Sequence, residues 1–282
     1  MAKESLQPEK SPSKISPELF SQTCDRLVDY QIPSSLFTYI NDSVENNRLV
    51  VILLSHQSYF DLEICRHICE DINQVAKNPI NSYLEFSSAA VGKNIGGLLS
   101  ERKEVYDRCH LNLLGVVRGP DKIHEKYKDQ ITEELLLASN INHNLYIKET
   151  NLGGCVSFIP FEATLHSGRV DQNTGIINGM KEVTDNPLLI RAIRQKAIII
   201  PCGIDGSYKI VDPDKHTLSN IFYDVIYNRN PQKVVTLKTG QPIDLLSSEY
   251  QGIPTRKLYQ DATLSVAKLV SPIAQGEYRK YL

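Results

Sequence analysis

The chain has no long hydrophobic run and no excess of either charge. Its longest apolar runs, 49–54 and 197–201, are far shorter than the roughly 20 residues that a membrane-spanning helix needs. Lys and Arg number 31 against 33 Asp and Glu, so the net charge of -2 does not predict a nucleic-acid partner. The polar N-terminus lacks the apolar segment of a signal peptide. We expect a cytoplasmic protein, and peripheral contact with a membrane stays open.

Several enzyme signatures are also missing. The chain has no Gly-x-Ser-x-Gly motif, and its six cysteines include no Cys-x-x-Cys pair. The glycine-rich segment 92–97 has neither P-loop nor dinucleotide spacing. On a helix, Cys65 and Cys69 share a face while His67 points away, so these three residues do not predict a metal site. We expect reduced core cysteines, no metal and no bound cofactor.

Apolar segments alternate with helical patterns along most of the chain. Runs typical of buried strands lie at 49–54, 111–117, 155–161, 197–201 and 233–237. Helical patterns lie between or after them, at 122–139, 187–195 and 255–274. Tyr146 and Ile147 are expected to begin a further strand. The alternation predicts an α/β fold with a mixed, largely parallel central sheet that helices cover on both faces.

The N-terminal part differs in composition from the rest. Residues 1–15 carry Lys, Pro, Ser and Glu with little to bury, which predicts a mobile tail. Ser16 and Pro17 are typical of a helix start, and Pro33 would end that helix. We expect a small helical extension at 16–47 and one main domain at 48–282.

A histidine followed five residues later by an aspartate occurs three times, at His56–Asp61, His124–Asp129 and His166–Asp171. The spacing alone therefore does not identify a site. His124 lies in a predicted helix, where five residues turn the chain by about 500°, so Asp129 points elsewhere. His166 lies in a predicted loop with no helix to position Asp171, and it is the second candidate.

His56 has a more informative context, because it directly follows the apolar run 49–54 and Ser55. Ser58 is expected to cap the next helix, which would make Asp61 its third residue. The Asp61 carboxylate would then turn back and bind one ring nitrogen of His56, which leaves the other nitrogen as a base. Backbone N–H groups at the helix start could stabilise an oxyanion. The expected chemistry is direct attack by a substrate hydroxyl.

These residues resemble the glycerolipid acyltransferases, the family of glycerol-3-phosphate and lysophosphatidic acid acyltransferases. The segment from Ser55 to Asp61 is similar to its first signature, Asn/Ser-His-x-x-x-x-Asp after an apolar strand. The segment 114–119, with Arg118, resembles the second signature, and 198–204 resembles the fourth. The resemblance covers about Leu49 to Ser207.

The third signature, typically Phe-Pro-Glu-Gly-Thr-Arg, is altered. Segment 158–164 contains Glu162 and a threonine, but Leu165 stands where the family has arginine. A second alignment matches Ser167-Gly168-Arg169 to the Ser-Gly-Gly-Arg form of the soluble plastid-type glycerol-3-phosphate acyltransferases. Both alignments stay open, with Arg169 preferred as the substrate contact.

The resemblance implies phospholipid biosynthesis: transfer of a fatty acyl group from acyl carrier protein or coenzyme A to a hydroxyl of glycerol 3-phosphate. His56 would be the general base and Asp61 would orient it. Cationic side chains would hold the phosphate. The substrate-binding candidates are Arg118, Arg169, Glu162 and Lys93.

The sequence leaves two alternatives open. One is an acyltransferase with a different acceptor, such as a lysophospholipid or another alcohol. The other is a catalytically idle member of the fold that binds lipid or a partner protein, because the third signature is altered.

Overall fold

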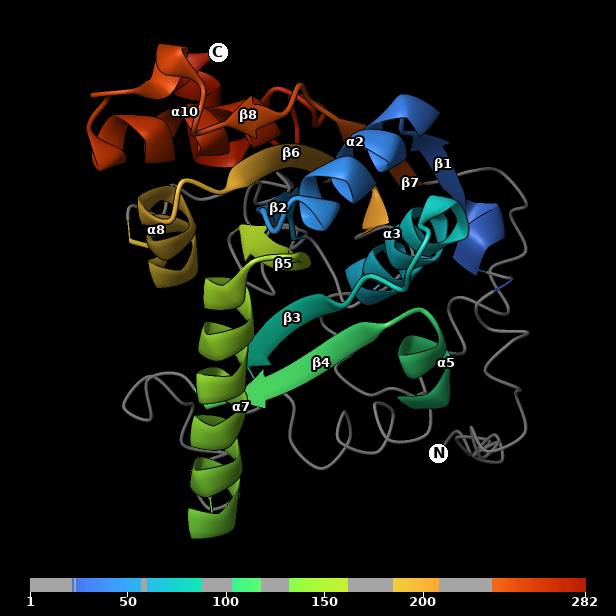
Figure 1. Cartoon of the computed structure of the whole chain (residues 1–282). Helices are drawn as coiled ribbons and strands as arrows, with labels where there is room; N and C mark the ends of the chain where they lie inside the picture. The colour runs from blue at the N-terminus through green and yellow to red at the C-terminus, as the bar shows by residue number, and fades with distance from the viewer. Residues whose placement is uncertain are drawn as a thin grey trace, which may run out of the picture.

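A computed structural model of the chain describes residues 22, 24–56, 60–87, 103–117, 132–161, 185–207 and 235–282. These residues form one eight-stranded sheet with helices on both faces (Figure 1). The predicted α/β fold with a mixed, largely parallel sheet is therefore confirmed. The expected tail at 1–15 lies outside the described residues.

The strands follow the order β1-β7-β6-β2-β5-β3-β4, and β8 pairs with β6. The central strand β2 is parallel to both of its neighbours, β5 and β6, while β7 is antiparallel to β6. The strands are β1 (Val28–Gln31), β2 (Leu49–Ser55), β3 (Ser82–Ser87), β4 (Leu111–Val116), β5 (Cys155–Phe161), β6 (Ile198–Asp205), β7 (Val235–Thr239) and β8 (Ile243–Asp244).

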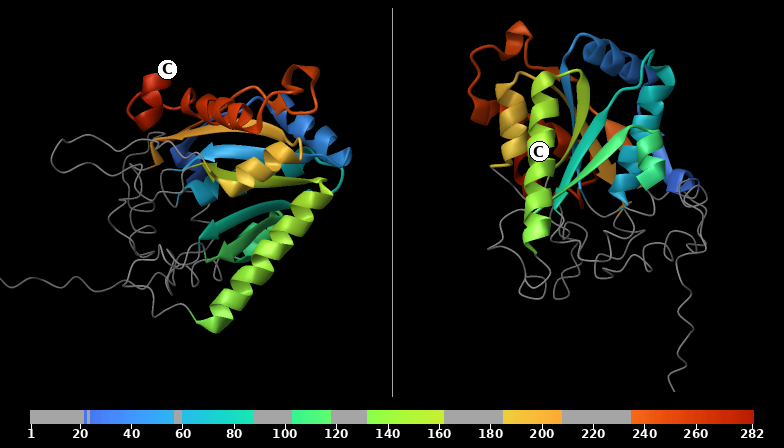
Figure 2. Two further views of the ribbon diagram at one scale, coloured as in Figure 1. Left: turned by 90° about the vertical axis from the view of Figure 1, so that its left-hand side faces the viewer. Right: turned by 60° about the horizontal axis from the view of Figure 1, so that its bottom comes forward.

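The helices form two layers, and the sheet lies between them (Figure 2). One hydrophobic core joins the sheet to α2, α3 and the end of α5, and the other joins it to α7, α8 and α10. The helices are α2 (Ser34–Glu45), α3 (Asp61–Val75), α5 (Lys103–Arg108), α7 (Glu133–Leu152), α8 (Pro187–Arg194) and α10 (Thr255–Ala267), with short 3-10 turns η4 (Ser248–Tyr250) and η5 (Gly276–Tyr281).

Strand β2 contributes to both cores because successive side chains of a strand point to opposite faces. All seven of its residues are buried. Val50, Ile52 and Leu54 lie in the core beside α3, and Leu49, Val51 and Leu53 lie in the core beside α10. Each such side chain contributes about 1.5–3 kcal/mol when it leaves water, which explains the unbroken apolar run in the sequence.

Two predicted elements are wrong. Residues 28–31 form a strand that pairs with β7, where the sequence predicted helix up to Pro33. Tyr146 and Ile147 lie inside α7, where the sequence predicted a strand. In both cases tertiary contacts override local propensity. Residues 28–31 pair with β7. Tyr146 is buried against the sheet, and α7 continues to Leu152, after which Gly153 has a φ of 72° that is typical of glycine.

Gly203 in β6 lies against the chain just after α10. A Cβ atom at this position would be 2.5 Å from Leu269 Cβ and 3.0 Å from the Leu269 carbonyl carbon. Gly240 offers a matched control, because its nearest contact would be an ordinary 3.5 Å from Pro201.

We expect Gly203→Ala to lower the free energy of unfolding by about 1–3 kcal/mol, since overpacking forces backbone and side chains to shift. Urea unfolding of this variant and of Gly240→Ala measures the difference. An equal effect of both substitutions would contradict the packing of β6 against Leu269.

Candidate active site

Five strands, β2 to β6, run in the same direction, so their carboxyl ends lie at one edge of the sheet (Figure 2). In open α/β sheets this edge is where ligands bind. In the sequence, a segment outside the described residues begins shortly after each of these ends: 57–59, 88–102, 118–131, 162–184 and 208–234. Within the described residues, the candidate site consists of the carboxyl ends of these strands and the start of α3.

His56 and Asp61 meet at this edge. His56 is the first residue after β2, and Asp61 is the first residue of α3. The His56 Nδ1 atom lies 2.9 Å from the Asp61 Oδ2 atom, and the exposed fractions of the two side chains are 15% and 2%. The hydrogen bond that the sequence predicts is thus present. When Nδ1–H donates to a carboxylate, the lone pair of the neutral ring is on Nε2.

The start of α3 differs from the prediction. The helix begins at Asp61 with Phe60 as its N-cap residue, so Asp61 is the first helical residue and not the third. Ser58, the predicted cap, lies outside the described residues. The Phe60 carbonyl accepts a hydrogen bond from Glu63 N–H at 3.0 Å. A carboxylate in the first turn also interacts favourably with the helix dipole.

Ser55 connects the end of β2 to β6. Its buried hydroxyl donates to the Ile204 carbonyl at 3.0 Å and accepts from the Ile204 N–H at 2.7 Å. These two bonds extend the contact between the strands beyond their last paired residues, Leu54 and Cys202. The sequence indicated Ser55 only as a motif position; its place in the structure shows that it holds the strand from which His56 emerges.

Two buried thiols lie near Asp61. Burial raises the pKa of Cys65 and of Cys202, and the negative charge of Asp61 raises both further. Both thiols are therefore neutral near pH 7 and are poor nucleophiles. All six cysteines of the chain are free and buried, which confirms that they are core residues.

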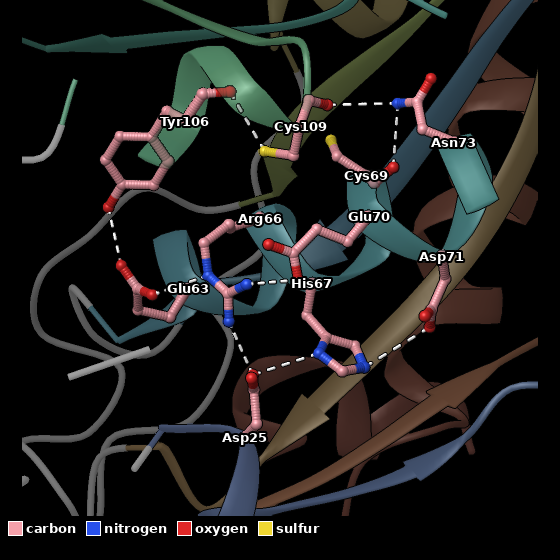
Figure 3. Close-up of polar contacts among 10 residues, drawn as sticks. All are labelled: Asp25, Glu63, Arg66, His67, Cys69, Glu70, Asp71, Asn73, Tyr106 and Cys109. Atoms are coloured by element: carbon pink, nitrogen blue, oxygen red, sulfur yellow. Dashed lines mark hydrogen bonds and ion pairs between the residues drawn. The ribbon is translucent and has the colours of Figure 1, made fainter. Parts of the chain in front are cut away.

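A charge cluster around the buried Arg66 supports α3 (Figure 3). Arg66 is 1% exposed, and its guanidinium contacts Glu63 at 3.0 Å, Asp25 at 2.7 Å and Glu70 at 2.5 Å. The Tyr106 hydroxyl donates to the other oxygen of Glu63 at 2.8 Å. Burial acts to lower the pKa of Arg66, but the adjacent carboxylates outweigh it and raise that pKa. The cluster joins α3 to α5 and to the segment that precedes β1.

His67 forms a second contact between a histidine and carboxylates. Its Nδ1 lies 3.1 Å from Asp25 and its Nε2 lies 3.4 Å from Asp71, while the ring stacks on Tyr30 with centroids 3.8 Å apart. Both ring nitrogens therefore face carboxylates, and His67 serves to attach the N-terminal segment to α3.

Sequence reasoning missed a third pair, which links α7 to the sheet. His143 Nδ1 lies 2.9 Å from Glu85 Oε2, with the histidine side chain 49% exposed and the carboxylate buried. The two residues are 58 positions apart, so no local spacing signals them. Glu85 lies on β3, which is two positions from β2 in the sheet, a distance of about 10 Å at the usual strand spacing.

The remaining predicted site residues lie outside the described part of the chain: Lys93, Arg118, Glu162, Arg169, and the pairs at His124 and His166. Two of them come shortly after described strands in the sequence. Glu162 is the next residue after Phe161, the β5 residue that pairs with Ser55, and Ser55 directly precedes His56. Arg118 follows the end of β4, which is three strands from β2, or about 14 Å.

Within the described ranges, no three His, Cys, Asp or Glu side chains are grouped in a way that could hold a metal ion. No helix in the same ranges has both the length and the apolar character needed to cross a membrane. Comparison of the chain with protein-family models matches no family, and comparison with curated proteins finds no match. The class that the fold and site define is thus an α/β protein with a histidine–carboxylate pair at the carboxyl edge of its sheet.

We expect Arg66→Met to lower the free energy of unfolding by about 3–5 kcal/mol, because it leaves the buried Glu63 carboxylate without its cation. Lys257→Met is the control: it breaks an ion pair with Asp261 that has the same four-residue spacing as Arg66 and Glu70, but both of its side chains are exposed. Exposed pairs of this kind contribute about 0.5 kcal/mol or less. Urea unfolding compares the two variants, and similar small losses would contradict a supporting role for the cluster.

Proposed function

We propose that the protein is an O-acyltransferase that moves a fatty acyl group from an acyl thioester to a hydroxyl of glycerol 3-phosphate. The observation that supports this most is the 2.9 Å contact between His56 and Asp61 at the carboxyl edge of the sheet. A partly exposed imidazole that is oriented by a buried carboxylate is suited to remove a proton from a substrate hydroxyl.

In the proposed reaction, His56 Nε2 takes the proton of the acceptor hydroxyl while the hydroxyl oxygen attacks the thioester carbonyl carbon. The new carbon–oxygen bond forms and the carbonyl oxygen becomes an oxyanion. The carbon–sulfur bond then breaks, and the imidazolium returns its proton to the leaving thiolate. Asp61 holds the ring in one tautomer and stabilises the imidazolium that forms between these two proton transfers.

Direct attack, without an acyl-enzyme intermediate, fits the two thiols near Asp61 in the described part of the chain. These thiols, Cys65 and Cys202, are buried and have raised pKa values. A covalent step would need a nucleophile that the base activates, and a neutral buried thiol does not serve.

The identity of the acceptor rests on the resemblance to the glycerolipid acyltransferases. In this proposal Arg118 and Arg169 hold the phosphate, with Lys93 and Glu162 as further substrate contacts. The chain order supports Glu162 most directly, since it follows the β5 residue that pairs with Ser55. The donor is acyl carrier protein or coenzyme A thioester, and the protein works in the cytoplasm with peripheral membrane contact as an option.

We expect His56→Gln to lower the rate of acyl transfer about 10²- to 10⁴-fold, because glutamine can accept a hydrogen bond from substrate but cannot take its proton. The matched control is His143→Gln, which changes a histidine with the same 2.9 Å carboxylate contact but a different place in the sheet. The assay follows labelled acyl group from acyl-coenzyme A or acyl carrier protein into glycerol 3-phosphate.

Unchanged transfer by the His56 variant, or equal losses in both variants, would contradict the proposed base. A panel of acceptors in the same assay distinguishes the alternatives. Transfer to a lysophospholipid or another alcohol but not to glycerol 3-phosphate would refute the proposed acceptor, and no transfer to any acceptor would favour a binding protein.

A further inference from the structure

Helix α7 exposes a row of apolar side chains to solvent, on the side that faces away from the sheet. Leu137, Ile141 and Leu145 are all exposed, Ile141 by 59%. At about 100° per residue, they lie within about 80° of one another on the helix surface. The buried residues of α7, Ser139, Tyr146 and Thr150, lie on the opposite side. We call the exposed face, with Leu137, Ile141 and Leu145 at its centre, the α7 stripe.

Several hydrogen bonds attach the inner face of α7 to the sheet, beside the apolar contacts of Tyr146 and Ile147. Ser139 Oγ accepts from the Val117 N–H at 2.8 Å, and Asn142 donates to the Gly115 carbonyl at 2.8 Å. Tyr146 and Ser157 share a hydrogen bond of 2.6 Å between their hydroxyl groups. The leucine and isoleucine side chains of the stripe take no part in this attachment. In Figure 1 and in the left view of Figure 2, the first turns of α7 extend past the strands.

The α7 stripe has a pattern that is symmetric about Ile141. Leu137 and Leu145 each lie four residues from Ile141, and Glu134 and Lys148 each lie seven residues from it. All five of these side chains are exposed. In an antiparallel pair of α7 helices related by a two-fold axis at Ile141, each Leu137 therefore faces Leu145 of the second copy. Each Glu134 faces Lys148, so the charges at both ends of the contact are opposite.

We propose that the α7 stripe is the contact surface of a homodimer in which two copies pair their α7 helices antiparallel about Ile141. A two-fold contact needs a surface that is complementary to itself, and this pattern meets the requirement in both apolar and charged positions. Antiparallel packing also places each helix N-terminus near the C-terminus of its partner, which is favourable for their dipoles. The inference does not depend on the proposed acyl transfer.

Charge argues against a membrane surface as the occupant of the α7 stripe. Helices that lie on anionic bilayers carry Lys and Arg beside the apolar face. The first turn of α7 carries Glu133 and Glu134 instead, and Lys148 is the basic residue beside the stripe. Lys148 Nζ is 3.6 Å from Glu149 and the side chain is 70% exposed, a surface contact weak enough to be exchanged for one across the dimer.

The size of the α7 stripe limits the affinity that we expect for the dimer. A helix of 20 residues is about 30 Å long, so one pair of helices buries less than the roughly 1,600 Å² of a standard interface. We therefore expect a reversible dimer whose population rises with protein concentration, and not a permanent one.

Sedimentation-velocity ultracentrifugation of the full chain over a range of concentrations tests the proposal. The wild type should shift from monomer to dimer, and Ile141→Glu, which places two carboxylates together on the axis, should weaken the dimer at least about tenfold, equivalent to 1.4 kcal/mol. Val75→Glu is the matched control, because Val75 is an exposed apolar residue on α3, outside the stripe. It should leave dimerisation unchanged.

A charge exchange tests the antiparallel register itself. Glu134→Lys alone and Lys148→Glu alone each bring like charges together and should weaken the dimer, whereas the double variant Glu134→Lys/Lys148→Glu should restore it. Circular dichroism confirms that each variant is folded.

Three outcomes would overturn the proposal: a wild type that is monomeric at all concentrations, a dimer that Ile141→Glu does not weaken, or a double variant that does not recover. If the wild type is monomeric, two further results identify the occupant. Co-sedimentation of the wild type, but not of Ile141→Glu, with phosphatidylglycerol vesicles would assign the α7 stripe to a membrane surface. A lower free energy of unfolding of Ile141→Glu without vesicles would assign the stripe to another segment of this chain.

Discussion

The burial of β2 between two parallel neighbours is the constraint on which the rest of the structure depends. The strand pairs along its full length with β5, from Leu49 opposite Cys155 to Ser55 opposite Phe161, and it also pairs with β6. Because both faces of β2 lie in apolar cores, a shift of one residue would exchange the side chains of the two cores. His56 is thereby placed at a defined point of the carboxyl edge.

Charged side chains on α3 position Asp61, the second residue of the candidate site. Asp61 begins α3, Glu63 follows in the same turn, and Glu63 and Arg66 belong to the charge cluster with Asp25 and Tyr106. Burying charges costs free energy, so such a cluster adds little net stability over apolar packing, but removal of one member leaves the others unpaired. We interpret the cluster as a device that sets the position of α3, and with it the position of Asp61 relative to His56.

The sequence predicted the parts of this arrangement that depend on local pattern. Apolar runs indicated β2, β5 and β6. The strand before His56, together with the helix predicted after it, distinguished this residue from His124 and His166. Contacts between distant residues could not be predicted: Arg66 lies 41 positions from Asp25, and His143 lies 58 positions from Glu85. The start of α3 was misplaced because Ser58 offered a conventional cap, although the helix begins at Asp61.

Helix α7 shows a different limit of sequence reasoning. Periodicity assigns the apolar side of a helix to the core. In α7 the side that packs on the sheet combines hydroxyl and amide hydrogen bonds with the buried Tyr146, while Leu137, Ile141 and Leu145 face outward. Tyr146 therefore looked like part of a strand, and the end of the helix at Leu152 was missed. The same reversal is the reason to regard the α7 stripe as a contact surface.

The central claim is that Asp61 holds His56 with Nδ1 protonated, so that Nε2 is the base. Long-range proton–nitrogen NMR of the seven histidine rings, with His56→Gln to assign the signals of His56, measures this directly. At a pH where the ring is neutral, we predict a protonated Nδ1 and an unprotonated Nε2 in the wild type. A proton on Nε2 with Nδ1 unprotonated would contradict the claim, because the carboxylate would then receive no hydrogen bond from the ring.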